Sequence, residues 1–373
     1  MTPLKGLRIL DFSTLLPGPF ATMILGDLGA DIIRLEAPDR PDLLREHNPA
    51  GHRTINRNKR SIIVNLKKSE AASFVINNLL PHFDILVEQF RPGVMQRLGL
   101  GYEDLKTKFP KLIYCSISGY GQNNKHSSRA AHDLNLVARS GMASYGGSSD
   151  DKPEIPSNQW ADMGGGSMYA MIAILSAVIE RQRSGLGQFL DVSMLHGSLA
   201  NQLMYAAEIL DNNATVKPRS QVLNGGSLYG YYRCKDGRFL AIASLEPHFL
   251  KELSKILELP DLLKTTNQSK LKSIIANKIA LYDYQTWLKK FKDSNCCVDP
   301  ILKLEEALQE NPEQVIQLSD GSTQLAHPVK FSRSALNYTN SGCPAGQHTI
   351  QILKEFGISD RHISELSAQG IIR

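Results

Sequence analysis

The first 120 residues alternate short apolar runs with helical patterns, and this alternation constrains the fold more than any other feature of the chain. Five runs are predicted to be strands: 7–12, 31–35, 61–64, 84–87 and 112–115. Helices are predicted between some of them, over 20–28 and 69–80. Strands that alternate with helices pair in parallel, because each helix carries the chain back across a face of the sheet. The predicted class is therefore α/β, with a Rossmann-like, doubly wound parallel sheet.

Later segments predict a second folding unit. An apolar helix is expected beyond Gly164, followed by a strand at 189–192 and a helix from about 195 to 210. Residues 212–226 are rich in Asn, Gly, Pro and Ser and are predicted to form a linker. Beyond it, Asp236-Gly237 lies between two β-rich runs, and a glycine that tolerates positive φ favours a hairpin there.

The length of 373 residues exceeds what one hydrophobic core usually serves, so two domains are expected. We place a large Rossmann-like domain at 1–200, completed by 325–373, and linkers with a small α+β domain at 201–324. The content of 42% hydrophobic and 21% charged residues is that of a globular protein and excludes a fibrous or disordered chain.

Charge and cysteine content limit which binding partners and which cellular compartment are expected. The 42 basic residues face 37 acidic ones, and a net charge of +5 is too balanced for a nucleic-acid-binding surface, so no nucleic-acid partner is expected. The densest basic run, 53–60, is either a solvated loop or a site for a phosphorylated ligand. Five cysteines form neither a zinc spacing nor a CxxC pair, which predicts no metal site and a reducing, cytoplasmic compartment.

No membrane segment is expected. The longest uncharged run, 163–179, is shorter than the about 20 apolar residues of a spanning helix, so we predict a buried helix there. Near the N-terminus, Asp11 interrupts the apolar stretch and Pro17-Gly18-Pro19 ends it, so no signal-peptide core forms.

Motifs of several common enzyme classes are missing. The turn after the first strand reads Pro17-Gly18-Pro19-Phe20 in place of GxGxxG, and the chain contains no Gly-Lys dipeptide. A bound dinucleotide and a P-loop are therefore not expected. HExxH and GxSxG are also missing, which removes support for zinc proteases and serine hydrolases of those types.

Three polar positions could carry chemistry, although each also has a structural explanation. His132 precedes Asp133 at the start of a helical pattern, where an imidazole could exchange protons near neutral pH or belong to a helix cap. Asp162 precedes three glycines, which leave room for a ligand; burial would raise its pKa, but capping also explains an acid there. Glu246 begins a helix and could orient a histidine or simply cap.

Fragments spread along nearly the whole chain carry a family resemblance: 7–11, 17–19, 25–31, 56–61, 90–94, 97–99, 118–122, Asp162 with its glycines, and 185–188. In these fragments the chain resembles the family III CoA-transferases, the CaiB/BaiF-type superfamily. Within that superfamily it is most similar to the α-methylacyl-CoA racemases, because His-Asp at 132 and Glu-Pro at 246 follow the racemase pattern.

The resemblance implies an isomerase of fatty-acid and lipid metabolism that epimerises C2 of 2-methylacyl-CoA thioesters by 1,1-proton transfer through an enolate. His132 and Asp162 would be the two acid/base groups, Glu246 would partner the histidine, and N–H groups at the start of the helix would stabilise the enolate. Two alternatives remain open. One is a CoA-transferase that moves CoA between carboxylic acids through an acyl anhydride at Asp162, and the other is an acyl-CoA-binding homologue without turnover.

The same resemblance implies which residues contact CoA: Arg34, Val64, Asn65, Leu66, Lys67, Gln89, Phe90, Arg91, Arg97, Ala131, Asp133, Leu134, Asn135 and Leu136. The CoA thioester is the substrate, so no cofactor and no metal are implied, and family members form an interlocked homodimer. Two departures leave the acyl group open: Ala37 stands where related racemases often carry an Arg, and Leu136 stands where a Tyr is common.

Overall fold

The computed structural model describes residues 1–147 and 152–373, and the chain divides into two compact units. The first unit comprises Met1–Ser140, Pro156–Gln202 and Glu313–Arg373, and the second comprises Gly141–Ile155 and Leu203–Pro312. The chain thus leaves the first unit twice and returns to it each time.

Two segments cluster elsewhere than the sequence predicts. Gly141–Ile155 was expected in the large domain and clusters with the second unit, whereas 313–324 was expected in the small domain and clusters with the first. The second difference has a visible cause. The strands β10 (Val315–Gln317) and β11 (Thr323–Leu325) form a hairpin, and the carbonyl of Leu325 accepts a hydrogen bond from the buried Arg57.

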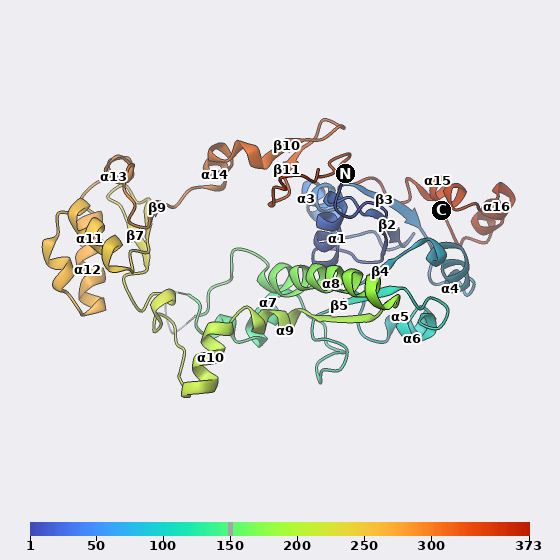
Figure 1. Ribbon diagram of the computed structural model, residues 1–373, viewed down its shortest axis with the longest axis horizontal. Helices are drawn as coiled ribbons and strands as arrows, with labels where there is room; N and C mark the ends of the chain where they lie inside the picture. The colour runs from blue at the N-terminus through green and yellow to red at the C-terminus, as the bar shows by residue number, and fades with distance from the viewer. Residues whose placement is uncertain (148–151) are drawn as a thin grey trace. The chain divides into compact units, whose positions relative to one another are not determined.

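The first unit is built on a six-stranded sheet in which every neighbouring pair of strands is parallel, in the order β3-β2-β1-β4-β5-β6 (Figure 1). Its strands are β1 (Arg8–Asp11), β2 (Asp31–Glu36), β3 (Lys59–Ile63), β4 (Ile85–Glu88), β5 (Ile113–Ser118) and β6 (Phe189–Ser193). The predicted parallel, doubly wound sheet is confirmed. The strand order reverses between β1 and β4, which is where such sheets leave a crevice at their carboxyl edge.

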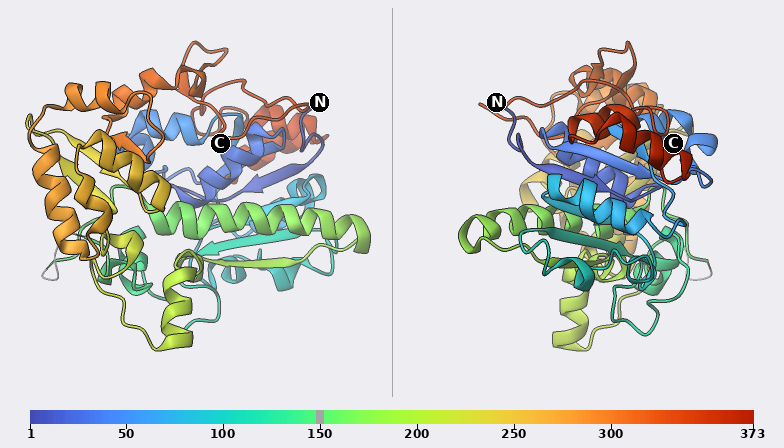
Figure 2. Two further views of the ribbon diagram at one scale, coloured as in Figure 1. Left: turned by 60° about the vertical axis from the view of Figure 1, so that its left-hand side comes forward. Right: turned by 90° about the vertical axis from the view of Figure 1, so that its right-hand side faces the viewer.

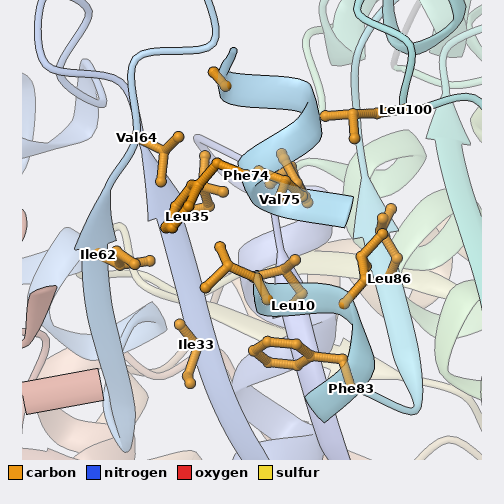
Figure 3. Packing of buried hydrophobic residues seen from close by; sticks show 14 of the residues in the cluster. Leu10, Ile33, Leu35, Ile62, Val64, Phe74, Val75, Phe83, Leu86 and Leu100 are labelled. Atoms are coloured by element: carbon orange, nitrogen blue, oxygen red, sulfur yellow. The ribbon is translucent and has the colours of Figure 1, made fainter. Parts of the chain in front are cut away.

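Helices cover both faces of this sheet. Leu10 pairs in register with Ile33 and Leu86, and this row packs against Phe74 and Val75 on one face (Figure 3). On the other face lie α1 (Pro17–Asp27) and α8 (Met168–Ser184), and α8 runs alongside β5 and β6 (Figure 2). Because both faces are covered, the central positions of most strands are apolar and buried, and this is why their sequences contain short apolar runs.

Two predicted helices differ in the structure. The helix expected at 69–80 changes its winding twice, from α4 (Ala71–Phe74) to a π-helix η1 (Val75–Leu79) and a 3₁₀ turn η2 (Leu80–His82). The single helix expected at 195–210 is wrong: α9 (Met194–Ala200) ends, and α10 (Leu203–Asn212) begins where the chain passes into the second unit. The remaining helices of the first unit are α2 (Leu44–His47), α3 (Pro49–Ile55), α5 (Val94–Arg97), α6 (Tyr102–Leu105), α7 (Asp133–Arg139), η4 (Trp160–Ser167), α15 (Thr349–Glu355) and α16 (Asp360–Ala368).

The second unit has its own core around a three-stranded sheet. The predicted hairpin is confirmed: β7 (Gly230–Arg233) and β8 (Phe239–Ile242) pair antiparallel, and Gly237 between them has φ +88°. The indole of the buried Trp287 donates a hydrogen bond of 2.8 Å to the carbonyl of Ile279. The other elements are β9 (Val298–Pro300), η3 (Met142–Ser144), η5 (Val222–Asn224), α11 (Pro247–Ile256), η6 (Pro260–Lys264), α12 (Gln268–Ile279), α13 (Tyr284–Phe291) and α14 (Leu304–Glu310), with η7 (Pro312–Gln314) at the boundary.

Within the described ranges, one helical stretch is long and apolar enough to cross a membrane by length and composition. It is Trp160–Ser184, which joins η4 to α8, and 44% of its most apolar window is buried inside the protein. Partial burial of this kind is also common for core helices of globular proteins, as the sequence analysis expected here.

A buried ion pair fixes the C-terminal segment to the sheet. Two guanidinium nitrogens of Arg57 donate to the two carboxylate oxygens of Asp27 at 2.8 and 2.6 Å, and a third bond of 2.6 Å reaches the carbonyl of Leu325. Both side chains are almost fully buried. A buried pair is stable only when its hydrogen bonds are satisfied, and here the C-terminal segment supplies one of the acceptors.

We predict that Arg57→Met lowers the free energy of unfolding by about 3–5 kcal/mol, because the Asp27 carboxylate would remain buried without its partner. Urea unfolding followed by circular dichroism measures this loss. The control is Arg361→Ala, which breaks an exposed pair with Glu365 and is expected to cost less than about 1 kcal/mol. Equal losses in the two variants would show that the buried pair does not hold the C-terminal segment.

Candidate active site

Two cavities lie at the carboxyl edge of the parallel sheet, where the strand order reverses. The first, here called the Arg34 cavity, measures about 520 Å³ and is lined by residues that follow or end β1, β2, β3 and β4, including Phe12, Arg34, Leu66 and Phe90. The second, the His132 cavity, measures about 340 Å³ and is lined by residues that follow or end β4, β5 and β6 and by His132. Phe90 lines both, so the two cavities are neighbours.

His132 stands immediately before α7, with its side chain exposed to the His132 cavity. The helix cap expected for this position exists, but the imidazole does not form it. The backbone N–H of His132 donates to the Asn135 side chain at 3.0 Å, and its carbonyl accepts from the N–H of Asn135 at 2.9 Å. The ring of His132 is therefore left to face the cavity.

Asp133 joins the start of α7 to the segment that carries Asp162. One carboxylate oxygen of Asp133 accepts hydrogen bonds from the backbone N–H groups of Ala161 and Asp162, at 2.7 and 2.9 Å. These two groups lie in the first turn of η4, a π-helix, a winding that is frequent at functional sites. The Asp133 carboxylate thus connects the start of α7 to two backbone groups that lie 28 and 29 residues further along the chain.

The Asp162 carboxyl has an unusual acidity. Burial, the larger cause, and the negative charge of Asp133 together raise its pKa from 3.8 to about 7. At neutral pH this group is about half protonated. The Asp162 carboxyl can therefore take or give a proton near pH 7.

The glycines after Asp162 serve packing between helices. A Cβ atom at Gly165 would lie 2.5 Å from the carbonyl of Met194, and one at Gly197 would lie 2.1 Å from the carbonyl of Gly165. Side chains at these positions would separate η4 from α9. The space beside these glycines, which the sequence analysis assigns to a ligand, is therefore filled by α9. The contact between α9 and η4 fixes the turn that holds Asp162.

The arginines predicted to contact CoA fall into two groups. Arg34 is 2% exposed, pairs with Asp42 and lies 3.7 Å from a carboxylate oxygen of Glu36, so its charge is matched internally. Its Nε is buried without a hydrogen-bond partner, and the residue still lines the Arg34 cavity. Arg91 and Arg97 are exposed, and within the described ranges neither pairs with a carboxylate. They are the predicted arginines whose charge is free for a phosphate.

The predicted segment 64–67 is tied to the C-terminus. Val64 is fully buried and forms an isolated β-bridge with Ile372, and the N–H of Asn65 donates to the carbonyl of Ile371 at 2.7 Å. Leu66 lines the Arg34 cavity, whereas the Lys67 ammonium pairs with Asp39.

The remaining predicted contacts cluster around the His132 cavity. Gln89, Phe90, Arg91, Ala131 and Asn135 line it. The Gln89 side chain accepts a hydrogen bond of 2.9 Å from the N–H of Gly18, which holds the first turn of α1 against the end of β4. Leu134 is exposed, but Leu136 is fully buried and packs inside the unit, so a hydroxyl at that position would not reach an open surface.

Glu246 belongs to the second unit. It precedes α11, where its carbonyl accepts from the N–H of Leu250 and its side chain makes no cap. The carboxylate is exposed, and among the described residues no cation pairs with it. Its partnership with His132 stays a prediction.

Sequence reasoning missed Glu88, a buried acid at the end of β4. Its carboxylate accepts a hydrogen bond of 2.7 Å from the N–H of Phe90, the residue that lines both cavities. Burial raises the pKa of Glu88 to about 7, against the opposing effect of a hydrogen bond with Ser116. The sequence feature that could have identified Glu88 is its position as an acid directly after the apolar run 85–87. Glu88 positions the wall between the two cavities.

The comparisons with known proteins show the family and agree with the fold. The model of CoA-transferase family III matches residues 4–349, and the chain belongs to this family. It is 35% identical to α-methylacyl-CoA racemase of Mus musculus over 99% of this chain and 97% of that protein. It is also 32% identical to succinyl-CoA:glutarate CoA-transferase of Mus musculus, over 100% of this chain and 91% of the relative. A CaiB/BaiF family protein from Brucella suis has the same fold, with a TM-score of 0.83 and 26% identity over 95% of this chain and 99% of its own.

The family assignment confirms the resemblance found in the sequence, and it makes the protein an enzyme of acyl-CoA chemistry. Racemases and transferases both stand among its relatives at similar identity. Among residues 1–147 and 152–373 no group of three or more His, Cys, Asp or Glu side chains could hold a metal ion.

We predict that Asp133→Asn lowers the pKa of Asp162 below about 7 while leaving it above 3.8. Asparagine keeps the side-chain oxygen that accepts the two N–H groups but removes the negative charge, whereas burial, the larger cause, remains. Titration of ¹³C-labelled aspartate carboxyls by NMR measures the pKa, with the Asp162 signal assigned from Asp162→Asn. Asp191→Asn is the control and should leave it unchanged. An unaltered pKa in Asp133→Asn would contradict the electrostatic role of Asp133.

Proposed function

We propose that the protein racemises C2 of 2-methylacyl-CoA thioesters by 1,1-proton transfer between His132 and Asp162. The observation that carries the proposal is the Asp133 carboxylate, which binds the Asp162 turn and immediately follows His132 in the chain. Inversion at a carbon next to a thioester carbonyl requires a base on one face and an acid on the other. The two groups exchange these roles when the reaction runs in the opposite direction.

The acidity of Asp162 is consistent with proton transfer. Burial and the charge of Asp133 raise the pKa of its carboxyl to about 7, so both protonation states are populated at neutral pH. The same pKa suits a group that must take a proton in one direction and deliver it in the other. The enolate between the two steps needs hydrogen-bond donors, and the N–H groups of Asp133 and Leu134 stand at the start of α7, where no earlier helical turn accepts them.

For the CoA moiety we propose the Arg34 cavity together with the free arginines. Arg91 lines the neighbouring His132 cavity, and Arg40 lines the Arg34 cavity three residues from Ala37. Arg40 would replace the arginine that related racemases carry at the position of Ala37. Guanidinium groups bind phosphate through two parallel hydrogen bonds, and this suits both residues for the nucleotide phosphates.

Two further parts of the proposal rest on the resemblance. Glu246 would orient the His132 ring and stabilise its protonated form, as carboxylates do in other His–acid pairs. The compartment would be the cytoplasm, in keeping with five free cysteines, three of which are buried.

We predict that deuterium enters C2 when a 2-methylacyl-CoA is incubated with the enzyme in deuterated water, together with loss of chirality. Replacement of one acid/base group should abolish racemisation but leave exchange from one face. His132→Gln is therefore expected to label one enantiomer only, and Asp162→Asn the other, as measured by mass spectrometry after chiral separation. The matched control is His126→Gln, which replaces a half-buried histidine that lines neither cavity and should keep full activity.

Other outcomes of this assay identify the alternatives. No deuterium incorporation, with a hydroxamate formed at Asp162 when hydroxylamine and an acceptor acid are added, would establish a CoA-transferase. CoA binding with neither reaction would establish an acyl-CoA-binding homologue. Labelling of both enantiomers by both variants would overturn the assignment of His132 and Asp162 to opposite faces.

We also propose that the protein is a homodimer. Three exposed apolar residues lie on one face of α8: Met168 (54% exposed), Ile172 (59%) and Ile179 (55%). Their spacing of four and seven residues aligns them along the helix axis, which is the pattern of a helix face that contacts another surface. A second copy of this chain is the partner that the family resemblance implies.

Light scattering after gel filtration is predicted to give twice the mass of the 41.3 kDa chain. Ile172→Asp should shift the protein toward the monomer, because a charge would enter an apolar contact. The control is Leu186→Asp, which places the same charge at an exposed leucine beyond the end of α8. A monomeric wild type would contradict the proposal.

A further inference from the structure

A cavity of about 630 Å³ lies within the second unit and takes no part in the proposed reaction. Its walls come from the loop between α10 and β7, from β7 and β8, and from α12. The polar side chains on it are Arg219, Lys272, Tyr229, Tyr231 and Glu154. Ala241 and Ile242 add an apolar floor from β8.

Two cations, Arg219 and Lys272, face this cavity. Among the residues that the structure describes, neither Arg219 nor Lys272 forms an ion pair, although Glu154 lines the same cavity. The ammonium of Lys272 donates one hydrogen bond, of 2.5 Å, to the carbonyl of Gly225, and a lysine has three N–H groups to satisfy. Burial lowers the pKa of Lys272, and the charge of Arg219 lowers it further. The fold thus holds two like charges close together, and an anion bound between them would offset their repulsion.

The loop that carries Arg219 is built to hold it in place. Arg219 has φ +56°, a left-handed conformation that is uncommon for residues other than glycine and is often found at functional sites. The Asn224 side chain bonds to both ends of the turn: its amide donates to the carbonyl of Lys217 at 2.9 Å, and its oxygen accepts from the N–H of Gln221 at 2.8 Å. Gly225, which ends this turn, has φ +99°, a conformation that favours glycine, and a Cβ atom at its position would lie 3.4 Å from Cγ of Arg219 and 3.7 Å from the ammonium of Lys272.

The aromatic side chains suggest the rest of the ligand. Tyr231 is 75% exposed, and it pairs across the strands with Ala241, whose small side chain leaves the space above the sheet open. Tyr229 lines the same cavity and is also exposed. Phenol rings beside a pair of cations favour a ligand with a charged head group and a planar or apolar body.

We propose that this cavity binds a small organic anion, with a carboxylate or phosphate head group held by Arg219 and Lys272 and a planar or apolar body against Tyr229 and Tyr231. The ammonium supplies a compact charge, and the guanidinium supplies two parallel donors for the oxygens of the head group. The site is independent of the proposed racemase reaction, so failure of either idea leaves the other standing.

Isothermal titration calorimetry on the full chain tests the proposal with three probes: benzoate, phenyl phosphate and the neutral benzamide. At least one anion is expected to bind and benzamide is not, and the tighter of the two anions identifies the head group. Lys272→Met and Arg219→Met are each expected to weaken anion binding about tenfold. Lys270→Met removes an exposed charge from the same helix outside the cavity and should change nothing.

Further variants keep the result interpretable. Lys272→Arg retains the charge and should restore binding, which excludes a loss caused by misfolding. Asp162→Asn should bind the anion as tightly as the wild type, because the site lies in the second unit. The proposal is overturned if neither anion binds, if benzamide binds equally well, if both methionine variants keep full affinity, or if Asp162→Asn abolishes binding.

Discussion

One carboxylate organises the candidate active site. Asp133 accepts hydrogen bonds from two consecutive backbone N–H groups of η4, and it is the first residue of the helix that His132 precedes. The rest of the site depends on this contact, because α7 and η4 belong to different parts of the chain. The close approach of η4 to α9 through Gly165 and Gly197 then fixes the turn from the other side. His132 and Asp162, which are 30 residues apart in the chain, are thus connected through the hydrogen bonds of Asp133.

The sheet could be predicted from the sequence, whereas the internal partners of the polar side chains could not, and the reason is physical. A strand buried on both faces needs apolar side chains at most of its positions, so it can be recognised from its own short stretch of sequence. A polar contact depends on a partner that the tertiary fold chooses. The resemblance implies that Arg34 contacts CoA, and the structure shows that its guanidinium also forms hydrogen bonds with Asp42 and His52 inside the protein. Nothing near Arg34 in the sequence distinguishes this use from a ligand contact.

The basic run 53–60 shows the same limit of prediction from sequence. The sequence predicts either a solvated loop or a phosphate site, and the structure shows neither for Arg57 and Lys59. Arg57 pairs with Asp27, and Lys59 lies 3.5 Å from Asp11, with all four side chains buried. Burial lowers the pKa of Lys59 to about 8, and the carboxylate of Asp11 acts in the opposite direction. These charges are neutralised inside the protein, and they serve to hold α1, β3 and the C-terminal segment together.

The acidity of Asp162 links position to chemistry. Asp133 both fixes the Asp162 backbone and, through its charge, adds to the effect of burial on the Asp162 carboxyl. Racemisation interconverts mirror-image centres of nearly equal free energy, so each acid/base group must work equally well as a proton donor and as an acceptor. A carboxyl with a pKa of about 7 meets this condition at neutral pH, where its two forms are equally populated. Asp133 therefore moves the pKa of the Asp162 carboxyl toward the value that the proposed proton transfer needs.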